Sequence, residues 1–258
     1  MTAINMICQR RRAFILTDGA GYDVNGVIRG FYSKTVTLPH LRAAVAVRGS
    51  IFGPALFATE WGARFTSFDD LVKGGGAVAE EVYDRMFTLL TAGGHVEIEI
   101  FLAGWSESRN RPETYWMASD DSLSRIAADV PSWMFILAEP FQVAPMPTED
   151  LLIQQGFDVD DIERLDPVTD GLKVMEAQRL SVGTLSADSG PVSAVGGFAS
   201  LTEIREDGVS QRIIRRWNDS IGEKIKPERV VMSDTITYMS RQQRRAAERG
   251  MRKARVTA

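Results

Sequence analysis

The sequence is poor in cysteine and histidine. Its 258 residues include one cysteine, Cys8, and two histidines, His40 and His95. A single cysteine cannot form a disulfide framework, and three scattered potential ligands argue against a zinc site. We expect a structural role for both histidines. Unless His40 or His95 serves as the base instead, the chain lacks the usual histidine base of serine and cysteine hydrolases. The sequence therefore predicts no metal and no cofactor.

Long hydrophobic runs are absent as well. No apolar segment reaches the ~18 residues that indicate a membrane-spanning helix. The first residues alternate in character and contain no apolar core of a signal peptide. The sequence therefore predicts a protein located in the cytoplasm, or in a particle assembled in the cytoplasm, with no membrane partner.

The net charge of −4 is distributed unevenly. Residues 241–258 contain seven basic residues and one acidic residue, so the chain that precedes them is acidic. Ser240 and Gln243 fit a capping box that would open a short basic helix. Clustered arginines can neutralise phosphates, but this tail has no aromatic residue for base stacking. We expect a helix that is solvated or docks on a partner protein, with nucleic-acid binding through the tail as the alternative.

The pattern of hydrophobic residues predicts the order of secondary-structure elements. In chain order it predicts strands in 2–49, helices in 50–93, strands in 95–140, a proline-rich loop in 139–150, helices in 149–181 and a hairpin in 193–219. This order favours an α+β fold in which two antiparallel sheets pack face to face under covering helices, a four-layer αββα sandwich. We expect this domain to span 1–225, and a C-terminal extension with a basic helical tail to span 226–258.

A glycine triplet at 74–76 lies inside the second predicted helix. It lacks the spacing of a phosphate-binding loop, and no predicted strand leads into it. Because glycine is a poor helix former, the triplet predicts a break or kink at this point.

Four residues near the start of the chain occur in an informative order: Thr2, Asp18, Lys34 and Gly49. They lie in the stretch TAINMICQRRRAFILTDGAGYDVNGVIRGFYSKTVTLPHLRAAVAVRG, with 16 residues from Thr2 to Asp18 and 32 from Thr2 to Lys34. This stretch resembles the proteasome β-subunits and HslV-type peptidases of the N-terminal-nucleophile (Ntn) hydrolase superfamily. In that family a threonine exposed by processing is followed by an aspartate at the end of the second strand. A lysine on the next extended segment and a glycine after a small apolar strand complete the set.

The resemblance implies that Thr2 acts as a nucleophile once Met1 has been removed. A threonine hydroxyl needs a base to take its proton, and a free α-amine with a pKa of ~7.7–8.0 can serve. In this scheme Lys34 supplies positive charge, Asp18 holds that lysine, and the Gly49 N–H donates to the oxyanion. The implied substrate is a peptide. The implied partners are further copies of the chain in a homo-oligomer, or the other subunits of a larger assembly.

Two features depart from the family pattern. The amine mechanism cannot operate while Met1 is attached, and the family's glycine-serine-glycine turn is missing, with Ser119 as the nearest substitute. The alternative is therefore a catalytically silent subunit that keeps the fold and serves in a larger assembly such as a phage particle. Each residue also has a purely structural interpretation: Asp18 as a turn residue, Lys34 as a solvated strand lysine and Gly49 as a strand-to-helix turn.

Overall fold

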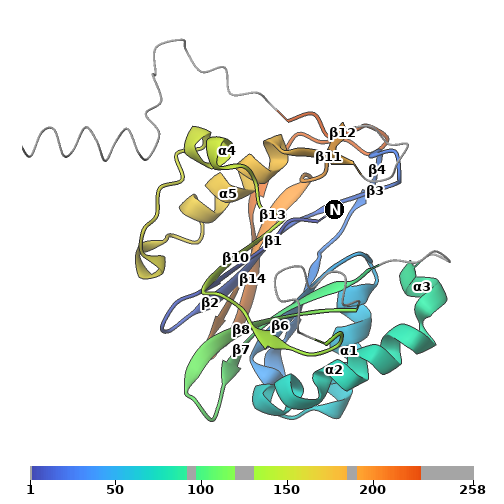
Figure 1. The fold of residues 1–258 in the computed structure, drawn as a ribbon, viewed down its shortest axis with the longest axis vertical. Coiled ribbons are helices and arrows are strands. Elements are labelled where there is room, and N and C mark those ends of the chain that lie inside the picture. The colour runs from blue at the N-terminus through green and yellow to red at the C-terminus, as the bar shows by residue number, and fades with distance from the viewer. Residues whose placement is uncertain (1, 92–96, 120–130, 185–190, 228–258) are drawn as a thin grey trace, which may run out of the picture. The chain divides into compact units, whose positions relative to one another are not determined.

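The computed structural model of the chain describes residues 2–91, 97–119, 131–184 and 191–227 (Figure 1). The chain divides into two units, Met1–Pro227 and Glu228–Ala258, and all the elements described below belong to the first. Two predictions lie outside the described residues: the basic helix that begins near Ser240, and the structural role of His95.

Five antiparallel strands form the first sheet. In spatial order they are β10 (Phe141–Ala144), β1 (Ile4–Cys8), β2 (Ala13–Asp18), β13 (Phe198–Arg205) and β14 (Gly208–Arg216). β1 and β2 pair with Ile4 opposite Thr17. β13 and β14 form the predicted hairpin, with Arg205 opposite Gly208.

β10 lies where the sequence predicts only a proline-rich loop. The strand pairs with β1 and forms one edge of the sheet. Pro140 precedes the strand and Pro145 follows it. Proline is tolerated at sheet edges because the donor that it lacks is not needed there. The edge position therefore explains how a strand can form in a segment that reads as a loop.

The second large sheet is also antiparallel. Its spatial order is β5 (Thr35–Leu38), β6 (Ala43–Arg48), β7 (Glu99–Ser106), β8 (Arg111–Ala118) and β9 (Ile136–Leu137). Two smaller sheets pair β3 (Ala20–Tyr22) with β4 (Ile28–Phe31), and β11 (Val182–Thr184) with β12 (Pro191–Ser193). The turn from β3 to β4 contains Asn25 and Gly26, and Gly26 has a φ of +80°.

The helices occur in two groups along the chain. They are α1 (Gly53–Arg64), α2 (Phe68–Arg85) and α3 (Phe87–Thr91) after β6, then α4 (Glu149–Gln154) and α5 (Thr169–Leu180) after β10, with 3-10 turns η1 (Pro39–Leu41) and η3 (Ile162–Arg164). α2 begins after Ser67, whose hydroxyl accepts a hydrogen bond from the Asp70 N–H at 3.1 Å. This cap satisfies one of the free N–H groups at the start of the helix.

Among the described residues, three large hydrophobic cores lie between the packed elements. Trp61 belongs to the core in which α1 and α2 cover one face of the second sheet (Figure 1). Ile15 and Ala46 belong to the core between the two sheets. Leu16 and Met175 belong to the core between the first sheet and α5. Adjacent residues of β2 enter different cores, so the strand is buried on both faces. The combination of antiparallel sheets and helices confirms the predicted α+β class.

α2 runs without a break through the glycines at 74–76, so the predicted break is wrong. A Cβ atom at Gly76 would lie 1.9 Å from the backbone oxygen of Trp133. The Gly75 carbonyl accepts a hydrogen bond from Trp61 Nε1 at 3.0 Å. Close approach of neighbouring segments therefore requires the glycines and outweighs their low helix propensity.

We expect Gly76→Ala to destabilise the protein, although alanine is the better helix former. The added methyl group would collide with a backbone oxygen, and overpacking of this kind costs about 1–3 kcal/mol. Gly62→Ala in α1 is the control, because its Cβ would only touch side-chain atoms of His40 and Leu38 at 3.4 Å. That variant should gain up to about 1 kcal/mol from helix propensity. Urea denaturation measures both changes, and a Gly76→Ala protein as stable as the wild type would contradict the packing role.

Candidate active site

The Asp18 carboxylate, at the end of β2, is fully buried and accepts four hydrogen bonds. Its Oδ1 accepts from the Ala3 N–H at 3.0 Å and from Lys34 Nζ at 2.8 Å. Its Oδ2 accepts from the N–H groups of Ala20 at 3.2 Å and Gly196 at 3.3 Å. These donors offset the cost of removing a carboxylate from water. Asp18 therefore joins the segment before β1, the start of β3 and the segment before β13 at one point.

Lys34 lies between β4 and β5 and forms a buried ion pair with Asp18 at 2.8 Å, with only 6% of its own side chain exposed. The interpretation of Lys34 as a solvated strand lysine is therefore wrong. Burial lowers the pKa of Lys34 below its ordinary value, the attraction of Asp18 opposes this change, and the nearby Arg48 lowers the pKa further. Lys34 consequently releases its proton more readily than a lysine in water does.

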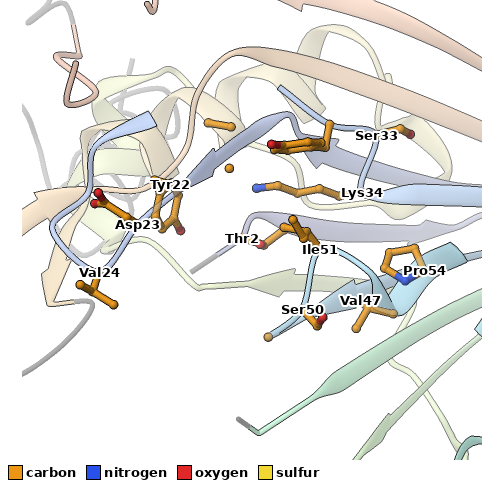
Figure 2. Close-up of a pocket in the computed structure, with 14 residues that line it drawn as sticks. Thr2, Tyr22, Asp23, Val24, Ser33, Lys34, Val47, Ser50, Ile51 and Pro54 are labelled. Atoms are coloured by element: carbon orange, nitrogen blue, oxygen red, sulfur yellow. The ribbon is translucent and has the colours of Figure 1, made fainter. Parts of the chain in front are cut away.

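Thr2, Lys34 and Gly49 line one pocket of about 330 Å³ (Figure 2). Thr2 directly precedes Ala3, whose hydrogen bond to Asp18 anchors the start of the chain. Gly49 follows β6 with a φ of +105°, a conformation that residues with a Cβ rarely adopt. Figure 2 shows the Lys34 side chain extending into the pocket beside Thr2. The structure thus brings three of the predicted residues to one pocket and places the fourth, Asp18, in contact with Lys34.

The remaining pocket residues are mostly apolar or aromatic, and the sequence analysis did not identify them. They include Tyr22, Val24, Tyr32, Val47, Ile51 and Pro54. The Tyr22 ring lies 5.9 Å from Lys34 Nζ, and the buried Tyr22 hydroxyl has no hydrogen-bond partner among the described residues. Burial, with a contribution from Asp18, raises the pKa of Tyr22, so its hydroxyl stays protonated at neutral pH. β3, β4 and the turn after β6 bring these side chains together. No sequence pattern predicts that they line the pocket.

Two other candidate side chains are not among the residues that line this pocket. The Ser119 hydroxyl, after β8, accepts a hydrogen bond from the Ile98 N–H at 2.8 Å. His40 lies in η1 and is exposed. The strand that pairs with β1 near Thr2 is β10, and residues 144–147 at its end carry no hydroxyl group. No serine therefore takes the place of the missing glycine-serine-glycine turn there.

We expect Asp18→Ala to destabilise the fold strongly, because it leaves Lys34 buried without its counterion. Breaking a buried pair in this way costs about 3–5 kcal/mol. Glu107→Ala is the control, since Glu107 pairs with Arg42 at 2.8 Å where both side chains are about one-third exposed. Removing such a pair should change stability by less than about 1 kcal/mol. Equal losses for the two variants in urea denaturation would show that Asp18 contributes no more than a surface charge.

The described part of the chain contains no group of three or more histidine, cysteine, aspartate or glutamate side chains placed to hold a metal ion. Within the same residues, no helix combines the length and apolar character needed to cross a membrane.

No protein-family model matches this chain, and no curated protein is significantly similar to it. Its chemistry must therefore be inferred from the geometry of the pocket.

Proposed function

We propose that this chain is an N-terminal threonine peptidase of the proteasome-like Ntn-hydrolase type, with Thr2 as the nucleophile after removal of Met1. The observation that carries this proposal is the shared use of Asp18 Oδ1, which accepts hydrogen bonds from the Ala3 N–H and from Lys34 Nζ. One buried oxygen thereby holds the residue after the nucleophile and the cation of the site in a fixed relation. Fixed orientation of this kind is a large part of what an enzyme contributes to a reaction.

Peptide hydrolysis at this site would take place in two steps. The α-amine of Thr2 takes the hydroxyl proton while Oγ attacks the carbonyl carbon, and the Gly49 N–H donates to the resulting oxyanion. The intermediate collapses when the protonated amine gives its proton to the leaving nitrogen, so that the C–N bond breaks and an ester links Thr2 to the substrate. Water then attacks this ester with the amine as base, which releases the acid and restores the Thr2 hydroxyl.

The charge of Lys34 supports this use of the amine. A positive charge beside the free α-amine would disfavour its protonation and so favour the neutral form that acts as a base. The same charge stabilises the alkoxide that develops on Thr2. Asp18 holds Lys34 in place and offsets its charge, which allows the ammonium form to persist in a buried position.

The packing order supports the same assignment. α1 and α2, the second sheet, the first sheet and α5 contact one another in succession. This succession agrees with the four-layer αββα sandwich that the resemblance to Ntn hydrolases implies. We also propose that the chain has this fold type, assembles into a homo-oligomer and is located in the cytoplasm.

A catalytically silent subunit of a larger assembly, such as a phage particle, is the second candidate. It is favoured by the absence of a hydroxyl group in residues 144–147 beside the start of β1. It is also favoured by exposed apolar side chains at and beside the pocket: Val24 is 66% exposed, Ile51 48% and Phe52 46%. Exposed apolar side chains that gather in one region are typical of interaction surfaces. In this case Met1 is retained and the pocket takes part in assembly.

We expect Thr2→Ala to abolish peptide hydrolysis, and Thr2→Ser to retain part of it because serine keeps the hydroxyl group. Lys34→Met should lower kcat by about 10²–10³, the range observed when one electrostatic contact to a developing charge is removed. Fluorogenic peptide assays, on protein whose intact mass shows the loss of Met1, measure these effects. Undiminished hydrolysis by Thr2→Ala would refute the enzymatic proposal. Retention of Met1 without hydrolysis would favour the silent subunit.

The pocket lining predicts the kind of side chain that the site accepts. Tyr22, Val47 and Ile51 present apolar surface, and a charged side chain would lose hydration there. The two charged residues of the lining are already paired, Asp23 with Arg29 and Lys34 with Asp18. We expect peptides with leucine before the scissile bond to be cleaved about tenfold or more faster, in kcat/KM, than matched peptides with lysine or glutamate. Equal cleavage of all three peptides, after subtraction of the Thr2→Ala background, would show that this pocket does not select the substrate.

A further inference from the structure

The turn at 196–197, which precedes β13, contacts Asp18 from a distant part of the sequence. The Gly196 N–H donates to Asp18 Oδ2 at 3.3 Å. The Gly196 carbonyl accepts hydrogen bonds from the N–H groups of Gly19 and Ala20, both at 3.0 Å. The turn therefore holds the carboxylate and also the two residues that follow it in the chain.

A buried ion pair holds the other side of this turn. Arg179 near the end of α5 and Asp219 after β14 pair through contacts of 2.7 and 2.8 Å, and their side chains are only 5% and 3% exposed. Asp219 Oδ2 also accepts from the Gly197 N–H at 2.7 Å. Arg179 Nη1 also donates to the Val195 carbonyl at 2.8 Å. The residues on both sides of Gly196 are thus bound to the same ion pair.

The turn and the ion pair pack closely against each other. A Cβ atom at Gly196 would lie 2.5 Å from Asp219 Oδ2 and 2.9 Å from Arg179 Nη1. Gly197 has a φ of +75°, a conformation that favours glycine. The Trp217 ring lies 5.1 Å from the Arg179 guanidinium carbon. Because these groups are in direct contact, a shift of the ion pair must displace the turn.

The segment that carries Asp219 also packs on β4, next to the pocket. The Ile28 N–H donates to the Glu223 carbonyl, and the Gly222 N–H donates to the Ile28 carbonyl, both at 2.9 Å. Ile225 is buried in a small cluster with Ile28 and Ala20. The residues after β14 therefore support the sheet of β3 and β4, which contributes Tyr22 to the pocket.

We propose that Arg179 and Asp219 are positioning residues of the candidate active site. They fix the turn at 196–197, and this turn fixes the Asp18 carboxylate that holds Lys34. The effect on hydrolysis rests on the proposed function, whereas the effect on Lys34 does not. A buried ion pair gains little stability over apolar residues of similar volume, because desolvation offsets the attraction. Net stability therefore does not explain the presence of this ion pair, whereas the geometry that the pair imposes on the turn does.

The variant Asp219→Asn tests this role, because it keeps the size of the side chain and removes its charge. We expect kcat to fall about 10- to 100-fold, since small displacements of catalytic groups have effects of this size. KM should stay unchanged, because no pocket-lining residue is altered. The matched control is Glu113→Gln on the β7–β8 hairpin, which neutralises a buried carboxylate bound to Arg109 and Arg111. The control should lose stability to a similar extent and keep its kcat.

A second measurement does not depend on hydrolysis. Acetic anhydride labels accessible, neutral amines, and mass spectrometry of the digested protein gives the labelling rate of Lys34. We expect Lys34 to be labelled several-fold faster in Asp219→Asn than in the wild type or in Glu113→Gln. If the wild type shows no hydrolysis that depends on Thr2, the proposed function is lost, and labelling alone then decides the positioning role.

For an active wild type, an unchanged kcat in Asp219→Asn, or an equal fall in Glu113→Gln, would overturn the positioning role. For an inactive wild type, an unchanged labelling rate would do so. If Asp219→Asn does not fold, the double variant Arg179→Met with Asp219→Leu replaces both charges by apolar groups that a protein interior accommodates. The same two measurements on that variant then decide the question.

Discussion

The ion pair between Asp18 and Lys34 sets the geometry of the candidate site. Taking two charges out of water is costly, and the structure offsets this cost with the attraction of the pair and three further hydrogen bonds to the carboxylate. The donors come from separate segments of the chain. Any displacement of one segment therefore changes the position of the carboxylate, and with it the ammonium group that faces the pocket.

The same arrangement fits an active enzyme and a silent relative. Thr2, Lys34 and Gly49 line one pocket in the folded chain. A peptide nitrogen cannot act as a base, whereas a free amine can, so one covalent bond separates the two candidate functions. The electrostatic part of the site depends on folding, and the proposed nucleophile depends in addition on processing.

Local sequence patterns predicted most of the fold, and they failed where tertiary contacts outweigh propensity. The β1–β2 pair, the β13–β14 hairpin and the cap of α2 depend on residues close together in the chain. The glycines of α2 have low helix propensity, but a carbonyl oxygen of Trp133 can approach only because no side chain stands at Gly76. Likewise β10 forms because it can pair with the edge of β1. The prolines on either side of β10 give no indication of this pairing in the sequence.

For the candidate site, the sequence by itself determined which residue types stand at Thr2, Asp18, Lys34 and Gly49 and in what order. Hydrophobic periodicity and turn chemistry act over a few residues, so the ends of β2 and β6 could be located from them. Only the tertiary structure decided that Lys34 is buried, and that Gly196 reaches Asp18 from 178 positions away. Hydrogen bonds between residues so far apart in the chain produce no recognisable pattern in the sequence, because they form only when the packed sheets bring the segments together.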